Sequence, residues 1–98
     1  VGALFGRHYI VIDTDMSPAM QEQAVFASYQ AFEHTRGDHD LAARHIVDEF
    51  NLRHGRAWHC LVGLDFATSN AQESGSFIYL RMDYNETSLG VILFRYGR

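Results

Sequence analysis

The spacing of apolar residues changes from helical to alternating close to Gly55, and this change limits the folds that are open to the chain. Before Gly55, apolar residues recur every three or four positions over 18–34 and 40–53, which predicts two helices with one buried face each. After it, and in the early segment 8–13, apolar residues alternate, which predicts strands. The predicted order is therefore one strand, two helices and four further strands.

Short connections join the four later strands, which favours antiparallel pairing between them. The fold class is therefore predicted to be α+β, an antiparallel β-sheet with two helices packed on one face in the order β-α-α-β-β-β-β. A polar turn is expected over 83–87, and residues 1–98 are expected to form one domain, because so short a chain holds a single core. The later strands are predicted at 58–62, 66–71, 77–82 and 89–96.

Capping residues mark the ends of both predicted helices. Ser17 can cap the first helix, because Pro18 behind it fits the first helical position, and Gly37 is expected to end that helix. Either Asp38 or Asp40 can cap the second helix. The predicted buried faces consist of Met20, Ala24, Ala27, Ala31 and Phe32 in the first helix and Ala42, Ile46 and Phe50 in the second.

Charge and composition exclude several classes of partner. The formal net charge of −4 gives no basic field for nucleic acid or an anionic membrane surface, so neither partner is expected. No apolar run approaches the roughly 20 residues of a membrane span, and no signal-peptide pattern precedes the first strand, so the cytoplasm is the expected location. The only cysteine, Cys60, cannot form a disulfide within the chain, which fits a reducing compartment.

Six histidines raise the question of a metal or acid–base site. None of them forms an H-x-x-x-H pair or an H-E-x-x-H motif, and the sequence holds neither a G-x-S-x-G elbow nor a phosphate-binding glycine loop. Asp38-His39-Asp40 more readily caps a helix than holds a divalent ion. We therefore predict no metal site, no cofactor and no enzymatic activity.

Trp58, His59 and Cys60 stand together in the first of the later strands. Neighbouring strand residues point to opposite faces, so His59 cannot readily activate Cys60 as a nucleophile, and Cys60 is predicted to be a small buried residue. Trp58 is predicted to lie in the core, with an interface as the alternative. For His59 two readings stay open. It is either a surface histidine or a histidine covered by a second subunit, in which case the dimer should weaken near pH 6 or below.

Four stretches, "VIDTDMSPAMQEQAV", "WHCLVGLDF", "FIYL" and "GVILFRYG", resemble the hub-type dynein light chains at these spacings across nearly the whole chain. The strongest local matches are Thr14-Asp15-Met16-Ser17, the run from Trp58 to Gly63, and Phe77-Ile78-Tyr79. The family consists of small homodimeric light chains that bind dynein intermediate chains and many other partners. The resemblance implies a strand-swapped dimer, in which the strand after Gly63 crosses to the partner's sheet and an extended peptide adds to its other edge.

The resemblance also implies the residues of the binding site. The floor of the peptide groove would be Phe77, Tyr79 and Gly90, and either His39 or Asp40 would face the central side chain of the peptide. The crossing strand would line the groove with Asp65, Phe66, Ala67, Thr68, Ser69, Asn70, Ala71 and Gln72. The implied dimer-interface residues are His59, Trp58, Thr68, Ser69 and Asn70.

The sequence also departs from the family pattern. Asp38-His39-Asp40 stands where the family typically has an acidic residue followed by lysine. Ser69, Ala71 and Gln72 stand where common members have an aromatic residue, a threonine and a histidine, which predicts an altered preference for glutamine-centred peptides. These departures, with the longer turn over 83–88, resemble the axonemal members of the family more than the common cytoplasmic one.

The resemblance therefore implies a non-catalytic dynein light chain that dimerises and binds intermediate-chain peptides by β-strand addition, in support of an axonemal, outer-arm dynein motor complex. The expected partners are dynein intermediate chains and a second light chain, in a homodimer or in a heterodimer with a paralogous light chain. The expected location is the cytoplasm and cytoskeleton, in the axoneme of a cilium or flagellum. The alternative is a general dimerisation hub for client proteins outside dynein.

Overall fold

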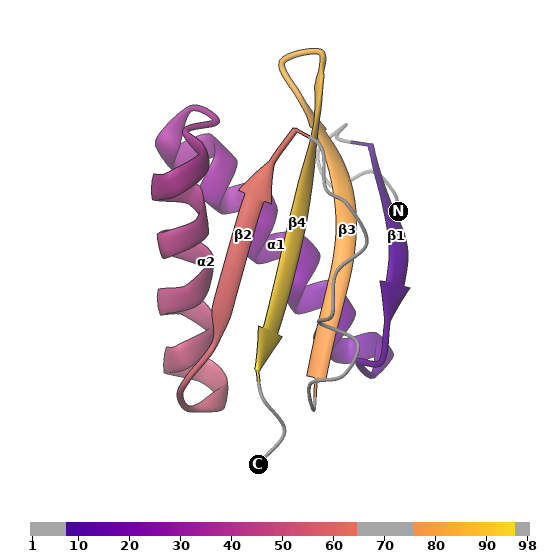
Figure 1. The fold of residues 1–98 in the computed structure, drawn as a ribbon, viewed down its shortest axis with the longest axis vertical. Coiled ribbons are helices and arrows are strands. Elements are labelled where there is room, and N and C mark those ends of the chain that lie inside the picture. Colours follow the sequence, from indigo (N-terminus) through magenta and orange to yellow (C-terminus); the bar gives the residue numbers. More distant parts are fainter. Residues whose placement is uncertain (1–7, 65–75, 96–98) are drawn as a thin grey trace.

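Two helices and four strands follow one another in the predicted order. The computed structural model describes residues 8–64 and 76–95. The strands form one sheet in the order β1-β3-β4-β2, and every neighbouring pair in it is antiparallel. The elements are β1 (Tyr9–Thr14), α1 (Pro18–Thr35), α2 (His39–His54), β2 (His59–Gly63), β3 (Ser76–Tyr84) and β4 (Thr87–Arg95), as labelled in Figure 1.

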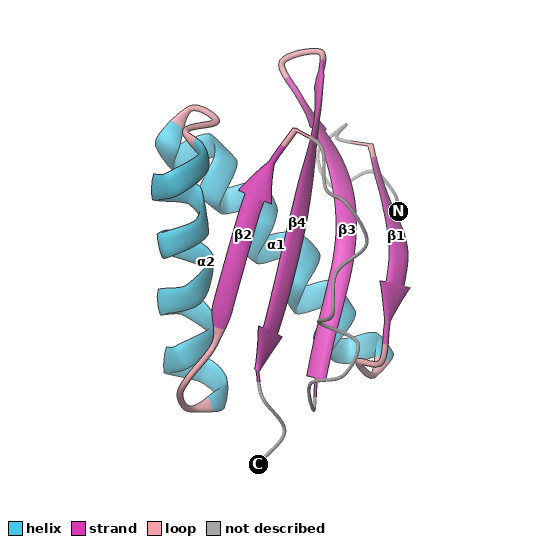
Figure 2. Ribbon diagram, viewed as in Figure 1, coloured by secondary structure: helices cyan, strands magenta, loops and turns pink. Residues whose placement is uncertain are grey.

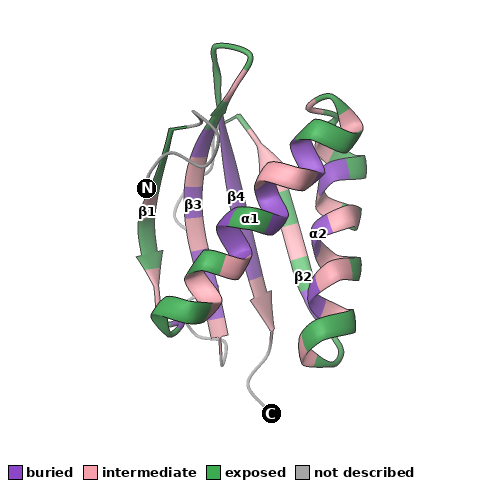
Figure 3. Ribbon diagram, turned by 180° about the vertical axis from the view of Figure 1, so that it is seen from behind, coloured by how far each residue is buried: buried purple, intermediate pink, exposed green. Residues whose placement is uncertain are grey.

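Both helices cover the same face of the sheet. In Figure 2, α1 crosses behind the strands diagonally and α2 runs beside β2, and Figure 3 shows both helices in front of the sheet from the other side. The predicted α+β class with two helices on one face is therefore confirmed. The predicted strand over 66–71 lies outside the described residues, so the fifth strand and the strand-swapped dimer stay predictions.

The helix ends follow the predicted capping residues. The Ser17 side chain accepts a hydrogen bond from the Met20 amide at 3.3 Å, and Pro18 occupies the first turn of α1. Asp38, and not Asp40, caps α2, because its carboxylate accepts from the Leu41 amide at 2.9 Å. Both helices therefore begin where local side-chain chemistry satisfies their free amides.

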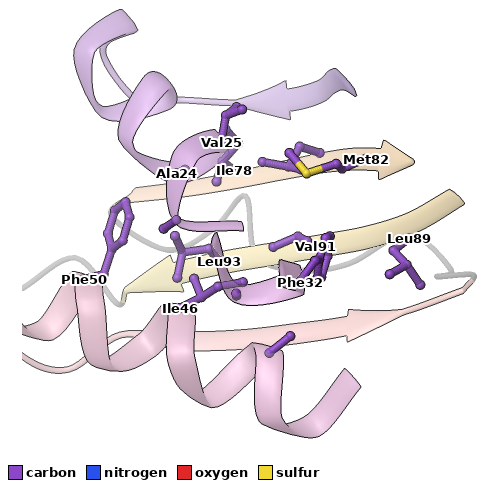
Figure 4. Close-up of a cluster of buried hydrophobic side chains, with 14 of the residues drawn as sticks. Ala24, Val25, Phe32, Ile46, Phe50, Ile78, Met82, Leu89, Val91 and Leu93 are labelled. Carbon is purple, nitrogen blue, oxygen red and sulfur yellow. The ribbon is translucent and has the colours of Figure 1, made fainter. Parts of the chain in front are cut away.

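The core lies between the helices and the sheet, as Figure 4 shows. In α1, alanines form much of the buried face, so this helix can lie close to the strands while Phe32 fills the space beside them. The predicted faces of both helices are the ones that the fold buries, although Met20 is only partly buried. The strands supply Ile78, Leu80, Met82, Leu89, Val91 and Leu93 to the same core.

The β3–β4 hairpin is longer than its sequence predicts. The polar turn was expected over 83–87, but Asp83 pairs with Ser88 and Tyr84 pairs with Thr87, so only two residues make the turn. These two, Asn85 and Glu86, have φ of 51° and 65°, which is the backbone of a type I′ turn. The expectation was wrong because this turn matches the strand twist and lets polar residues on both sides stay in the ladder.

Tyr84, next to the turn of this hairpin, also ties the hairpin to the corner between the helices. Its ring lies 6.0 Å from the ring of Phe32, measured between centroids. It also lies so close to Gly37 that a Cβ there would come within 3.1 Å of the ring. Because Gly37 also has φ of +81°, glycine is the residue that fits this corner.

Phe50 gives a test of this core. Replacing the buried Phe50 by alanine is expected to lower the free energy of unfolding by about 3–5 kcal/mol, because it leaves a cavity against Trp58. Leu52→Ala is the matched control in the same helix, since Leu52 is 84% exposed, and it should change stability by about 0.5 kcal/mol or less. Urea unfolding followed by circular dichroism measures both, and equal losses would contradict the assignment of the buried face.

Candidate functional site

The face of the sheet opposite the helices, called the outer face below, carries its own apolar cluster. Phe77 and Ile92 are buried there, and Tyr79 and Phe94 pack against them while partly exposed. The strand register aligns these side chains into rows that run across β3, β4 and β2. The rows are Phe77–Phe94–His59, Tyr79–Ile92–Leu61 and Arg81–Gly90–Gly63.

Side chains of β2 alternate between the two faces, as the sequence predicts. Trp58, which directly precedes β2, is 2% exposed and packs edge-on against Phe50 at 5.0 Å, on the helix side. Cys60 packs against the same core. His59 is exposed on the outer face, where its ring stacks on Phe94 at 5.3 Å between centroids. Adjacent His59 and Cys60 therefore point away from each other.

Burial of the Cys60 side chain raises the pKa of its thiol, because water no longer stabilises the thiolate. A thiol with a raised pKa stays neutral near pH 7 and is a poor nucleophile. His59 lies on the other face and cannot take its proton. The geometry therefore supports the reading of Cys60 as a structural residue, partly buried against the core, rather than a catalytic one.

The backbone of Phe77 is fixed by two side chains from the end of β1. The Thr14 hydroxyl donates to the Phe77 carbonyl oxygen at 2.7 Å, and the Asp15 carboxylate accepts from the Phe77 amide at 2.8 Å. The same Thr14 oxygen accepts from the Met16 amide at 3.0 Å. Thr14 and Asp15 thus set where β3 begins and how Phe77 is presented on the outer face.

The predicted groove residues divide into three groups. Phe77, Tyr79 and Gly90 lie together on the outer face, in adjacent rows of β3 and β4. His39 is the first residue of α2 and is half-buried. The helix α2 begins at the end of the molecule where the chain leaves β2 (Figure 1). The predicted strand residues, 65–72, lie outside the described residues.

The predicted interface residues are also separated by the fold. His59 lies on the outer face, but the side chain of Trp58 belongs to the core of its own chain, where the Arg95 guanidinium lies 4.7 Å from its ring centroid. Trp58 can therefore contact a partner only through its backbone. Thr68, Ser69 and Asn70 lie outside the described residues.

Three residues near the site were not singled out from the sequence. Thr14 and Asp15 were part of a quoted motif, but their bonds to Phe77 join segments far apart in the chain. Arg81 stands within the apolar strand β3, two positions after Tyr79, and its guanidinium donates to the carbonyl oxygen of Leu64. Strand alternation alone places Arg81 on the face of Tyr79, so this signal was present in the sequence.

The described residues contain neither a metal-binding cluster nor a helix that could cross a membrane. Within residues 8–64 and 76–95, no three histidine, cysteine, aspartate or glutamate side chains gather in a way that could hold a metal ion. None of the described helices combines the length and apolarity needed to cross a membrane.

The sequence profile described as "Dynein light chain type 1" matches residues 8–96, which is nearly the whole chain. The chain belongs to the dynein light chain type 1 family. As a light chain of this family it is a non-catalytic component of dynein, a microtubule motor, and its partners are those of a dynein complex. The prediction that it is not an enzyme is confirmed by this membership.

Solved structures with the same fold include the dynein light chain-like domain of the calcium-binding protein FhCaBP2 from Fasciola hepatica. Its mercury derivative is 17% identical to this light chain and its native form 15% identical, each with a TM-score of 0.68. Both alignments cover 92% of this chain and 93% of that chain. At such identities the likeness supports the fold alone.

The environment of Cys60 makes a chemical prediction for the light chain. Iodoacetamide at pH 8 should modify the native protein slowly, because burial holds Cys60 as a neutral thiol, and should modify the protein fully in guanidinium. His59→Ala should leave the native rate unchanged. The pKa of the Cys60 thiol is higher in the folded chain than in the unfolded chain. As the pH rises past about 8.5 the thiol therefore ionises first in the unfolded chain, and the free energy of unfolding decreases. Mass spectrometry measures the modified fraction. Fast modification of the native protein that is lost in His59→Ala would contradict the structural role of Cys60 and support a catalytic pair with His59.

Proposed function

We propose that this light chain dimerises by exchanging the strand that follows Gly63 and binds extended intermediate-chain peptides by β-strand addition. The observation that carries the proposal is the position of β2, which pairs with β4 and has no other described strand beside it. An edge of this kind can accept a further strand, since no other described strand pairs with the backbone amides and carbonyls on that side. Because α2 runs beside β2, a strand added at this edge would lie next to the second helix.

The apolar cluster of the outer face supports a second subunit and a peptide on this side of the sheet. Aromatic side chains there give a bound segment a large area to bury. In the proposed groove Phe77 and Tyr79 form the floor beside Gly90, and His39 approaches from the start of α2. The strand lining the groove is 65–72, and the proposed interface consists of His59, Thr68, Ser69 and Asn70 with the backbone of Trp58.

The proposal extends to a motor of the axonemal outer-arm class, in a cilium or flagellum. Sequence differences from common family members support this extension. They occur at Ser69, Ala71 and Gln72, and at Asp38-His39-Asp40 at the start of α2. A dimer holds two intermediate chains side by side, so the second binding step becomes intramolecular and gains effective concentration. A weakened self-interface would favour a heterodimer with a paralogous light chain.

Peptide binding is tested by titrating the purified light chain with a dynein intermediate-chain peptide and following its amide NMR signals. Chemical shifts should change over residues 66–72 and at Phe77 and Tyr79, while a scrambled peptide of equal composition changes none of them. Saturable binding with shifts confined to another surface would contradict the proposed groove. The absence of binding by the homodimer, with binding recovered after co-expression of a paralogous light chain, would favour the heterodimer.

Acidification tests the proposed place of His59. If a partner subunit covers this side chain, its protonation places a charge in an apolar contact, so the dimer is expected to dissociate more readily as the pH falls below about 6. The sign is set by the neutral form being the one that the interface accommodates. Sedimentation velocity between pH 8 and pH 5 measures the change. His59→Gln should remove it, and an unchanged dimer across this range would rule His59 out as the sensor.

A further inference from the structure

Arg81 occupies an unusual place on the outer face. It follows Tyr79 by two residues on β3, so both side chains lie on the same face. In the described strands the other arginine is Arg95, which lies on the helix side over Trp58. Arg81 is therefore the one arginine or lysine that the described strands present on the outer face.

The guanidinium of Arg81 is held in place by neutral oxygens. Its Nε donates to the Ser88 hydroxyl at 2.9 Å, and its Nη2 donates to the Ser88 carbonyl at 3.0 Å and to the Leu64 carbonyl. Its Nη1 donates to the Tyr79 hydroxyl at a longer 3.3 Å. These contacts fix the side chain, and they leave one Nη1 hydrogen without a partner among the described residues.

No carboxylate balances this charge within the described residues. The hydrogen bonds that the guanidinium makes go to oxygens of Ser88, Leu64 and Tyr79, and none of these is a carboxylate oxygen. A carboxylate is a strong acceptor for a guanidinium N–H, because the hydrogen bond is then assisted by the opposite charges. Among the described residues Arg81 is thus a positioned cation without a carboxylate partner, and its remaining Nη1 hydrogen can donate to one.

The row that contains Arg81 also leaves room for such an anion. Gly90 stands opposite Arg81 on β4, and Gly63 stands opposite Gly90 on β2. Neither glycine has a side chain, so Arg81 supplies the only side chain of this row across the three strands. A segment lying over Gly90 and Gly63 can therefore approach the guanidinium from that side, while Ile10 of β1 stands beside Arg81 on the other side.

We propose that Arg81 is a specificity-determining residue that selects an acidic side chain in the bound extended peptide. The inference rests on the proposed function, in which Tyr79 and Gly90 form the floor of the groove and Arg81 continues it. Charge complementarity identifies the occupant, because a guanidinium favours an aspartate or glutamate and disfavours lysine. The Arg81 contacts to Leu64 and Ser88 serve to hold the guanidinium still, so little side-chain entropy is lost when the carboxylate binds.

The experiment uses fluorescein-labelled peptides from a dynein intermediate chain, amidated at the C-terminus so that side chains supply every carboxylate. One set carries a single aspartate moved through successive positions, and matched sets carry asparagine or lysine there. Fluorescence anisotropy with the dimeric light chain should show one position at which aspartate binds about tenfold more tightly than asparagine. This preference should shrink at high salt, as expected of a partly exposed ion pair.

Substitutions of Arg81 separate its charge from its structural contacts. Arg81→Gln should abolish the preference for aspartate and leave binding of the asparagine peptide within about twofold, whereas Arg81→Lys should retain part of the preference. Arg81→Glu should reverse it in favour of the lysine peptide, and such a gain of binding cannot come from misfolding. Arg44→Gln, an exposed change on α2 with the same loss of charge, should keep the wild-type preference.

The outcomes distinguish this inference from the proposed function. Tight binding of every peptide with no preference for aspartate at any position would overturn the role of Arg81, but it would remain consistent with the proposed peptide groove. A preference that survives Arg81→Gln and Arg81→Glu unchanged would do the same. The absence of binding by any intermediate-chain peptide would overturn both.

Discussion

Two helices can cover only one face of this sheet, and the rest of the molecule is organised around that constraint. The helix side receives the alanine-rich face of α1 and the Ile46 and Phe50 side of α2, and it forms the main core. The other side keeps aromatic residues that no helix covers, with Phe77 and Tyr79 among them. A sheet that is apolar on both faces is best covered by something added to it, which in the proposed function is a second subunit and a peptide.

Much of the fold could be predicted from the sequence because it depends on local patterns. The four-residue spacing of Ala42, Ile46 and Phe50 allows one buried face, and that face is buried. The β3–β4 turn was misjudged, because Asn85 and Glu86 adopt positive φ without a glycine to signal it. A turn of this kind is recognised by its geometry, whereas the polarity of its flanks suggests a longer loop.

The candidate site was predictable only in part, for a physical reason. Alternation along β3 was enough to put Phe77 and Tyr79 on one face. The bonds that Thr14 and Asp15 make to Phe77, and the bond that Arg81 makes to Leu64, join segments distant in the sequence, and no periodic pattern encodes such pairs. Residues that fix a site in three dimensions are therefore harder to find than residues that line it.

The contact between Tyr84 and Gly37 has a consequence for how variation spreads through this fold. The turn end of the hairpin rests on the corner that precedes α2, so the first turn of that helix is set partly by Tyr84, which lies far from it in the sequence. A larger or smaller side chain in place of Tyr84 would move the corner, and His39 would move with it. The residues around Tyr84 in the hairpin and the residues around Gly37 before α2 are thus expected to change together when related chains diverge, because they pack against each other.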